Sequence, residues 1–339
     1  MLQLEQNVNL QDFNTLAIPA QARYFASVTS LQALRELLDW TNTKDVPLLV
    51  LGGGSNLVLA QDFAGLVLQV NLTGIERVKE TADAVYLQVG AGENWHKTVE
   101  YSLSEGCWGL ENLGLIPGSV GAAPIQNIGA YGLELCERFS HLQAMDISTG
   151  ELVEFDAEAC QFGYRDSVFK RHLRGRYVIT SVTLKLLKSP QLRLDYPALR
   201  AAVEADSSVS LTPVQVFDAV CKIRRSKLPA PEEVPNAGSF FKNPLVSAAS
   251  FAELQGRFPD IVGYVVDPQT VKLAAGWLIE RSGFKGYCEG RVGVHPHQAL
   301  VLTNPGRGGG AEVLALAEKV AQAVKSLFGV ELEMEPQVY

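Results

Sequence analysis

The chain has few cysteines and no closely spaced pair of them. Five occur among 339 residues, and none belongs to a C-x-x-C motif. An odd, sparse set suits neither a disulfide framework nor a zinc ribbon. We therefore expect buried free thiols.

The sequence also lacks an excess of positive charge and any long apolar run. Lys and Arg number 29 against 37 Asp and Glu, a formal net charge of -8. Nucleic acids and anionic membranes select positively charged faces, so we expect neither as a partner. No apolar stretch approaches the roughly 18 residues of a membrane span, and residues 1–13 lack the pattern of a signal peptide. We expect a cytoplasmic protein whose anionic ligands need a local basic pocket.

What the chain does have is the composition and length of a folded protein. Hydrophobic residues make up 47%, and the 30 glycines and 16 prolines are too few for a fibrous or disordered chain. At about 150 residues per domain, the length indicates roughly two domains.

Helical and strand-like patterns are mixed along the chain. Thr212 and Pro213 form a helix start, and Gly329 a helix stop. Apolar spacing near 3.6 predicts helices over 30–40, 94–105, 212–226, 247–256, 271–282 and 311–328. Strand patterns appear at 46–51, 152–155 and 177–187, in short runs within 66–90, and in the tail 330–338. This mixture indicates an α+β protein.

The first glycine-rich segment, GGGSN at 52–56, follows a predicted buried strand. A dinucleotide fingerprint would need a third glycine where Leu57 stands, and the nearest candidate acid, Glu76, follows a turn instead of a second strand. A phosphate-loop lysine is also missing. Either the segment is only a tight turn, or its consecutive N–H groups converge on an anion, with Ser55 and Asn56 as side-chain donors.

A second glycine-rich segment, 114–132, favours the binding interpretation. It reads GLIPGSVGAAPIQNIGAYG, with small residues, turn formers and amides but little periodicity. An ordinary surface loop would carry more charge. Backbone that closely approaches a large flat ligand requires this composition, and long aperiodic segments in compact domains are usually functional.

Six motifs together resemble one known family, the FAD-dependent UDP-N-acetylenolpyruvoylglucosamine reductases of peptidoglycan synthesis, also called UDP-N-acetylmuramate dehydrogenases. The resemblance covers nearly the whole chain, and the region of Tyr196 is similar to the type that keeps a tyrosine loop over the substrate. The motifs are GGGSN (52–56), the segment 114–132, GYRDS (163–167), NAGSFFKNP (236–244), HQALVL (297–302) and LEMEPQV (332–338).

The resemblance implies an α+β fold with a FAD-binding domain of the vanillyl-alcohol-oxidase type. That domain would comprise two α+β subdomains, residues 1–68 together with the tail 329–339, and residues 69–211. A smaller α+β domain, 212–328, would bind the substrate. No histidine lies in either glycine segment, so we expect noncovalent FAD. The positions that match the family's FAD-binding residues are Gly52, Gly53, Gly54, Ser55, Asn56, Leu57, Pro117, Gly118, Ser119, Gly121, Ala122, Asn127, Gly129, Ala130 and Tyr131.

The implied reaction passes a hydride from NADPH to flavin N5 and then to the methylene carbon of an enolpyruvyl ether, giving UDP-N-acetylmuramate. By the same resemblance, Arg165 would grip the substrate carboxylate with its planar fork, Glu335 would be a second polarising group, and Ser239 would donate the proton. Without the resemblance, Arg165 would be read as a surface arginine or a partner of Asp166, and Ser239 as a turn cap.

The matching substrate-binding positions are Tyr164, Tyr196, Lys227, Asn243 and Gln298. Lys227 belongs to a basic cluster with Lys222, Arg224 and Arg225, which suits a diphosphate, although an exposed helix end also favours cations.

His295 and His297 could share one face of a strand, but no third ligand is evident, so we expect no metal. No heptad or large apolar stripe demands association, and we expect a monomer. Two other functions stay open from the residues alone: a flavin-dependent oxidase of the same fold, and a non-catalytic nucleotide-binding module.

Overall fold

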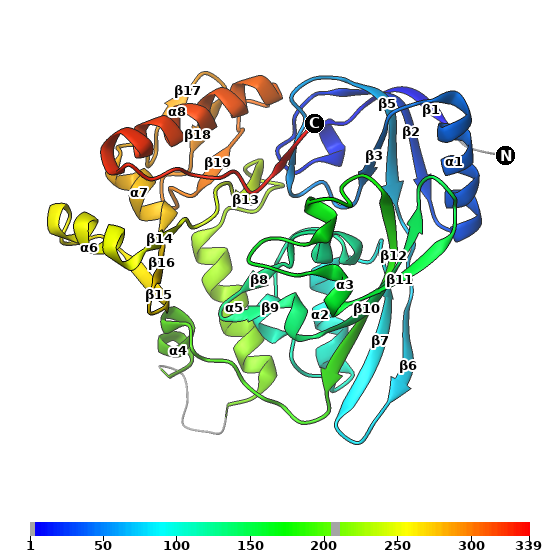
Figure 1. Cartoon of the computed structure of the whole chain (residues 1–339), viewed down its shortest axis with the longest axis horizontal. Helices are drawn as coiled ribbons and strands as arrows, with labels where there is room; N and C mark the ends of the chain where they lie inside the picture. The colour runs from blue at the N-terminus through cyan, green and yellow to red at the C-terminus, as the bar shows by residue number, and fades with distance from the viewer. Residues whose placement is uncertain (1–3, 205–210) are drawn as a thin grey trace. The chain divides into compact units, whose positions relative to one another are not determined.

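The computed structural model describes residues 4–204 and 211–339 (Figure 1). The chain forms two compact units. Unit 1 comprises residues 1–8, 22–54 and 64–226, and unit 2 comprises 9–21, 55–63 and 227–339. Three segments of the chain therefore contribute to each unit, and the units are described separately below.

Two sheets form the framework of unit 1. In the first, strands β3 and β5 run parallel and in register, Leu48 opposite Leu66. Its order is β1 (Glu5–Asn9), β2 (Gln21–Val28), β5 (Phe63–Val70) and β3 (Leu48–Leu51). The second sheet is antiparallel, in the order β11 (Leu152–Asp156), β10 (Phe139–Asp146), β12 (Tyr177–Leu187), β7 (Ala84–Gly90) and β6 (Ile75–Glu80).

The helices of unit 1 begin and end where local sequence requires it. The Thr212 hydroxyl accepts from the Gln215 N–H (3.3 Å), and the Gln215 side chain accepts from the Thr212 N–H (2.9 Å), a capping box at the start of α5. The helices are α1 (Leu31–Lys44), α2 (Trp95–Ser104), α3 (Ala157–Cys160), α4 (Pro197–Glu204) and α5 (Pro213–Lys227). Of α5, only its last residue is grouped with unit 2.

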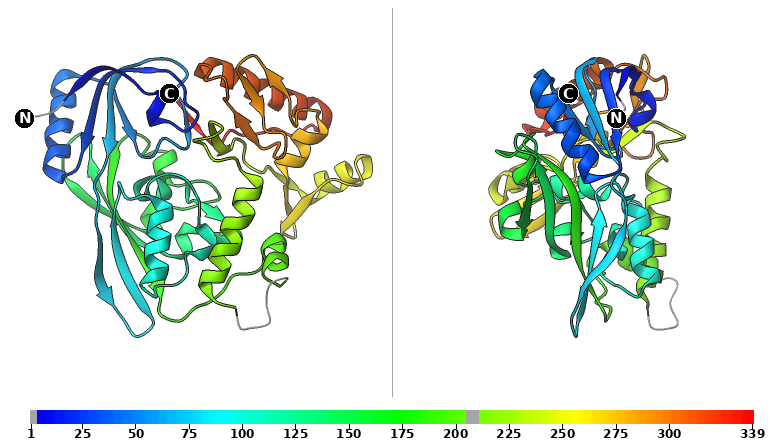
Figure 2. Two further views of the ribbon diagram at one scale, coloured as in Figure 1. Left: turned by 180° about the vertical axis from the view of Figure 1, so that it is seen from behind. Right: turned by 90° about the vertical axis from the view of Figure 1, so that its right-hand side faces the viewer.

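The segment 110–137 of unit 1 is built from very short elements, as its lack of periodicity predicts. It contains the 3-10 turns η2 (Glu111–Leu113), η3 (Val120–Gln126) and η4 (Leu135–Glu137) and the strands β8 (Gly129–Ala130) and β9 (Leu133–Glu134). It lies near α2 and α5 in Figures 1 and 2. Two further turns, η1 (Gln11–Phe13) and η5 (Val168–Lys170), complete the described 3-10 structure.

Unit 2 combines short strands with three helices. One sheet has the order β13 (Asn236–Ser239), β19 (Val301–Thr303), β18 (Val292–Val294) and β17 (Cys288–Glu289). Another has the order β14 (Leu245–Ser247), β16 (Thr270–Leu273) and β15 (Gly263–Asp267), and β20 (Gln337–Val338) pairs with β4 (Leu57–Val58). The helices are α6 (Ala248–Arg257), α7 (Ala275–Arg281) and α8 (Gly310–Phe328).

Most predicted elements are confirmed, and three predictions need correction. The predicted helix over 271–282 is a strand up to Leu273, and α7 begins only at Ala275. The tail is not a continuous edge strand, because only Gln337–Val338 are strand. All five cysteines are free, but Cys288 is exposed and Cys136 only half-buried, so the prediction of buried thiols is wrong for these two residues.

The two units do not follow the predicted domain boundaries. The tail 329–339 is grouped with 227–328, and most of α5 is grouped with the sheets of unit 1. The three-domain division stays a prediction. Within the described ranges, no helix is both long enough and apolar enough to cross a membrane.

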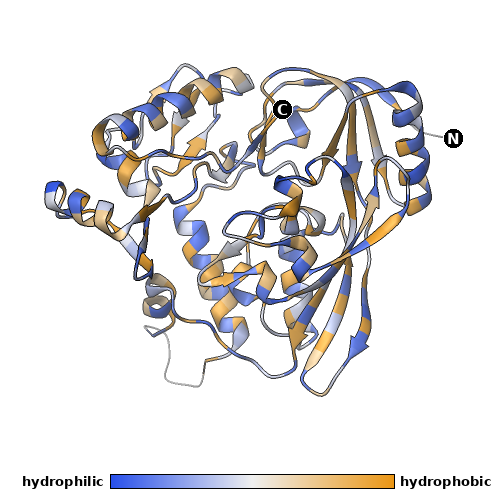
Figure 3. Ribbon diagram, in the orientation of Figure 1, coloured by the Kyte–Doolittle hydropathy of each residue, from blue (hydrophilic) through white to orange (hydrophobic). Residues whose placement is uncertain are grey.

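The longest helix of unit 2, α8, begins in close contact with the backbone of Leu59. Figure 3 shows orange and blue segments alternating along it, as expected for a helix with one apolar side. Gly329 ends it in the left-handed conformation (φ 71°). At its first residue, Gly310, an added Cβ would overlap the carbonyl oxygen of Leu59, so only glycine allows this contact.

We predict that Gly310→Ala lowers the free energy of unfolding by about 1–3 kcal/mol, because the Leu59 backbone must move. Gly256→Ala is the matched control. Gly256 is exposed in α6 with nothing within 4 Å of an added Cβ, so this change should stabilise by about 0.5–1 kcal/mol. Urea unfolding of both variants measures the difference, and equal effects would contradict the packing argument.

Candidate active site

The two glycine-rich segments meet directly within unit 1. A Cβ added to Gly53 would lie 2.9 Å from the Gly118 Cα, and one added to Gly52 would overlap the Ser119 hydroxyl. Gly121 packs against Ala91 in the same way, with an added Cβ 2.5 Å from the Ala91 Cβ. Close backbone approach with no side chains between forms a cradle of small residues, which fits a large flat cofactor such as FAD.

The second half of GGGSN belongs to unit 2, where it holds the C-terminal tail. The Asn56 side-chain amide donates to the Glu335 carbonyl oxygen (3.4 Å), and the Asn56 carbonyl accepts from the Gln337 N–H (3.0 Å). Leu57 then pairs with Gln337 in β4. The anion-binding role of Ser55 and Asn56 stays a prediction, since the Asn56 amide also has this structural role.

Arg165 lies at the tip of a tight turn in unit 1. Gly163 and Asp166 exchange backbone hydrogen bonds across it (3.0 and 3.2 Å), and Arg165 takes a left-handed φ of 53°. Its guanidinium donates to the Gly129 carbonyl and lies 5.3 Å from the centre of the Tyr164 ring. Asp166 pairs with Arg171 (3.1 Å). The turn therefore fixes Arg165 against the predicted cofactor segment.

Asn127 joins this turn to the second glycine segment. Its side-chain amide donates to the Glu134 carboxylate (2.8 Å) and the Gly163 carbonyl (3.1 Å), and its oxygen accepts from the Cys136 N–H (3.0 Å). The Asn127 side chain thus has a bracing role that the sequence does not reveal.

An aromatic and basic cluster lies beside Arg165. The rings of Tyr131 and Tyr196 meet edge to face with centroids 5.0 Å apart. Burial raises the pKa of Tyr131, and the charge of Arg224 opposes that rise. Burial also lowers the pKa of the Arg224 guanidinium, and the nearby charge of Arg165 acts in the same direction.

Arg224 is the residue of this cluster that sequence analysis undervalued. The sequence indicates it only as part of a basic cluster, yet its Nε is buried with no hydrogen-bond partner among the described residues. The available signal was its spacing, since Val216, Val220 and Arg224 follow each other at i, i+4 and i+8 and the first two are core residues. Two arginines beside the tyrosine pair favour an anionic ligand.

Unit 2 brings Ser239 and Glu335 together. Ser239 ends β13 opposite Val301, and the next residue, Phe240, accepts a backbone hydrogen bond from the Glu335 N–H (2.9 Å). Both catalytic candidates are half-buried. The turn-cap alternative for Ser239 does not hold, because Asn236 caps this turn by accepting from the Gly238 N–H (2.8 Å). The Ser239 hydroxyl makes no hydrogen bond within residues 4–204 and 211–339.

Two of the predicted substrate residues meet at the start of α7. Asn243 accepts from the Ala275 N–H (2.9 Å), and the Gln298 side-chain oxygen lies 3.2 Å from where a Gly276 Cβ would be. Lys227 is exposed at the end of α5. The structure thus groups Ser239 with Glu335 and Asn243 with Gln298 in unit 2, and Arg165 with Tyr164, Tyr131 and Tyr196 in unit 1.

His295 and His297 do not form the start of a metal site in the described part of the chain. Their rings meet edge to face at 5.7 Å, and the His297 N–H points at the His295 Nδ1 (3.4 Å). Across the described ranges, no group of three or more His, Cys, Asp or Glu side chains has the arrangement of a metal site.

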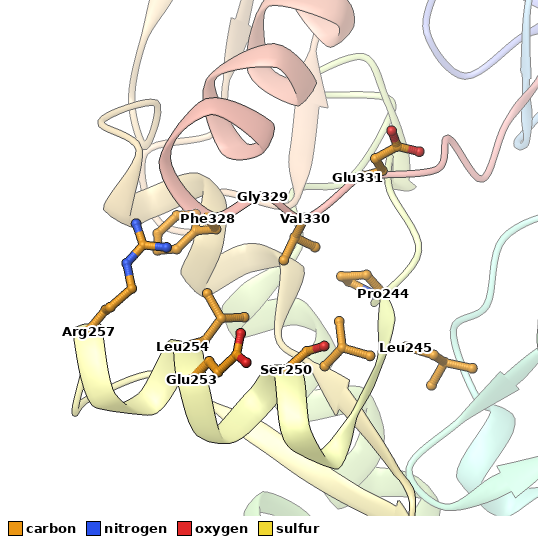
Figure 4. A pocket seen from close by; sticks show the side chains of 11 residues that line it. Pro244, Leu245, Ser250, Glu253, Leu254, Arg257, Phe328, Gly329, Val330 and Glu331 are labelled. Atoms are coloured by element: carbon orange, nitrogen blue, oxygen red, sulfur yellow. The ribbon is translucent and has the colours of Figure 1, made fainter.

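A cavity of about 400 Å³ in unit 2 lies apart from these residues (Figure 4). Its walls come from β14, α6 and the end of α8, with Leu254, Phe328 and Val330 as apolar contacts and Glu253, Arg257 and Glu331 as charged ones. None of the predicted catalytic residues lines it. It is therefore not the predicted site.

Two family models match the chain. Residues 22–156 match an FAD binding domain, and residues 230–339 match the C-terminal domain of UDP-N-acetylenolpyruvoylglucosamine reductase. The first match includes both GGGSN and the segment 114–132, and the second includes Ser239 and Glu335.

Individual proteins agree with these models. A relative from Paraburkholderia xenovorans (strain LB400), named UDP-N-acetylenolpyruvoylglucosamine reductase, is 52% identical over 96% of this chain and 95% of its own. The crystal structure of UDP-N-acetylenolpyruvylglucosamine reductase from Thermus caldophilus has a TM-score of 0.70, with 24% identity and all of both chains covered. That of p-cresol methylhydroxylase has a TM-score of 0.50, with 10% identity over 96% of this chain and 83% of its own. The predicted α+β fold with a FAD-binding domain of the vanillyl-alcohol-oxidase type is confirmed.

The unpaired Arg224 generates a prediction about stability. Arg224→Met should raise the free energy of unfolding of the ligand-free protein by about 1–2 kcal/mol, because a partly buried charge without a partner is removed. Arg225→Met, at an exposed position on the same helix, should change it by less than about 0.5 kcal/mol. Urea unfolding in the absence of ligands measures both, and a destabilised Arg224→Met would contradict this reading.

Proposed function

Because the chain belongs to the UDP-N-acetylenolpyruvoylglucosamine reductase family, we propose that it reduces the enolpyruvyl ether of UDP-N-acetylglucosamine enolpyruvate to UDP-N-acetylmuramate. NADPH is the reductant and FAD the noncovalent cofactor. The observation that best supports this function is the Ser239 hydroxyl, half-buried, free of any capping bond and tied through Phe240 to Glu335. The reaction belongs to peptidoglycan precursor synthesis in the cytoplasm, and the protein acts as a monomer.

The cofactor is held by backbone more than by side chains. Gly53 and Gly118 are in close contact, with no room for a Cβ on Gly53, so backbone N–H groups of the two segments would be the donors to the phosphates of FAD. The predicted subdomains 1–68 (with 329–339) and 69–211 supply these groups, and 212–328 supplies Ser239, Asn243 and Gln298 to the substrate. The chemistry that bound FAD contributes is hydride transfer, from NADPH to N5 and from N5 to the substrate methylene carbon.

Arg165 binds the substrate carboxylate. A guanidinium presents two parallel N–H donors to a carboxylate, and its charge stabilises the negative charge that builds up as hydride arrives. The turn 163–166 and the bond to the Gly129 carbonyl preorganise the fork, so little side-chain entropy is lost on binding.

Ser239 protonates the carbon next to the carboxylate. A hydroxyl is a weak acid, so it serves only when the acceptor carbon is strongly basic, as an enolate carbon is. Its freedom from other hydrogen bonds leaves the proton available. Glu335 polarises the enolpyruvyl group from the segment that hydrogen-bonds to Phe240.

The UDP-sugar is bound by polar and aromatic side chains. Asn243 and Gln298 at the start of α7 offer amide donors and acceptors, and exposed Lys227 offers a charge for the diphosphate. Tyr164 lies against Arg165. Tyr196 directly precedes α4, and its ring contacts Tyr131, so it can cover the nucleotide.

We predict that the purified protein is yellow, and that NADPH bleaches its flavin absorption. Oxidation of NADPH should depend on the enolpyruvyl UDP-sugar, match product one to one and release no peroxide. A colourless protein that refuses FAD would overturn the proposal. Peroxide formed from an alcohol substrate would identify an oxidase instead.

We predict that Ser239→Ala leaves flavin reduction by NADPH within about twofold but slows flavin reoxidation by the enolpyruvyl sugar by about 10²-fold or more. Stopped-flow absorbance measures the two half-reactions separately. Ser250→Ala, on exposed α6, serves as the control and should match wild type in both. Equal losses in the two half-reactions of Ser239→Ala would argue against a proton-donor role.

A further inference from the structure

The first residues of α2 hold the segment 113–119 in place. The Trp95 N–H donates to the Gly118 carbonyl (3.0 Å), and its indole Nε1–H donates to the Leu113 carbonyl (3.0 Å). Asn94 and Ser119 add an isolated antiparallel bridge. Trp95 is only 1% exposed, so these bonds are shielded from water. They fix both ends of a short stretch that includes Pro117, Gly118 and Ser119.

His96 holds the middle of the same stretch. Its Nδ1 accepts a hydrogen bond from the Leu115 N–H (3.1 Å). Leu115 has a φ of 55°, a left-handed conformation that costs a leucine about 1 kcal/mol or more. A bond from this amide helps to keep it in that conformation. The accepting Nδ1 must be unprotonated, so the ring is the neutral form with its hydrogen on Nε2.

The ring of His96 is held in orientation by α5. It stacks on Phe217, with centroids 5.5 Å apart and planes 16° apart. The Phe217 ring also packs against the backbone of Gly114, where an added Cβ would lie 2.8 Å from the ring. Stacking and close packing leave the Nδ1 lone pair directed at the Leu115 amide.

We propose that His96 is a positioning residue for FAD: neutral, it holds the Leu115 amide and thereby the course of residues 114–119, and protonated, it releases that amide and weakens FAD binding. This role rests on the proposed binding of FAD by residues 114–132. His96 does not touch the cofactor in this account; it acts through the segment that does.

The charges around His96 favour the neutral ring. Burial lowers its pKa, and Arg225 and Arg224 on α5 lower it further, while Glu100, whose Oε1 lies 3.5 Å from Nε2, raises it. Residues 113–117 carry no titratable side chain. Because the pKa is lowered overall, the hydrogen bond is intact near neutral pH and is lost as pH falls through that lowered pKa, when an N–H would face an N–H.

Two substitutions separate this role from simple packing. His96→Asn places an amide oxygen close to where Nδ1 lies, so it can accept from Leu115, but it has no pKa in this range. His96→Phe keeps the ring that stacks on Phe217 and removes the acceptor. His141→Asn is the control, since His141 lies on β10 beside Ser140 (3.1 Å) and has no bond to the segment.

The measurement is the dissociation constant of FAD, from fluorescence of flavin released on dilution of the holoenzyme, between about pH 5 and 8. Wild type and His141→Asn should lose affinity together in acid. His96→Asn should bind within about threefold of wild type at pH 8 and show no acid loss, and His96→Phe should bind about five- to tenfold more weakly at pH 8.

The role is overturned if His96→Phe binds FAD like wild type, or if His96→Asn keeps the acid loss. If His96→Phe does not fold, the pH profile of His96→Asn alone decides. These outcomes leave the proposed function standing, whereas wild-type protein that binds no FAD at any pH would overturn both.

Discussion

The backbone hydrogen bonds between the 239–242 segment and the C-terminal tail are the constraint on which the proximity of Ser239 and Glu335 in unit 2 depends. Phe240 accepts from Glu335, and Lys242 donates to the Glu333 carbonyl, both at 2.9 Å. The side chains of Phe240 and Phe241 are 0% and 1% exposed, so these backbone hydrogen bonds lie beside buried apolar side chains. These backbone bonds bring together two residues far apart in sequence, Ser239 at the end of β13 and Glu335 in the bend before β20.

In unit 1 the main constraint is electrostatic, because two arginines lie near each other. On a chain with eight more acidic than basic residues, Arg165 and Arg224 lie close enough to lower the pKa of Arg224. Such like-charge proximity costs stability in the absence of an anion, and a bound anion relieves it. The charge of Arg224 also helps to lower the pKa of His96, after burial and Arg225, so it favours the hydrogen bond from the Leu115 N–H to the neutral ring.

The elements that the sequence predicted well are those with strong local signals. The capping box at Thr212, the apolar stripe of α8 and its stop at Gly329 fix those helices without help from distant residues. Motifs alone predict the residues of the site. In unit 2 the Glu335 N–H bonds to the residue after Ser239, and the catalytic roles of both stay predictions.

The predictions that were wrong concern segments whose structure depends on pairing with strands distant in sequence. Residues 270–273 have apolar spacing that suits a helix, but they pair with β14 and β15. The alternating tail forms strand only where β4 offers a partner, at Gln337–Val338. The roles of Arg224 and His96 were missed because they arise from what α5 and α2 pack against, which the spacing of residues alone does not specify.

The central claim of the proposed function is that Arg165 and Glu335 act on one and the same step. A double-mutant cycle with Arg165→Met and Glu335→Gln, measured on the rate of flavin reoxidation by the enolpyruvyl sugar, tests it directly. Groups that stabilise one transition state are not independent, so the two losses should combine with a coupling energy of about 1 kcal/mol or more. Losses that simply add, or that fall in different half-reactions, would contradict the account.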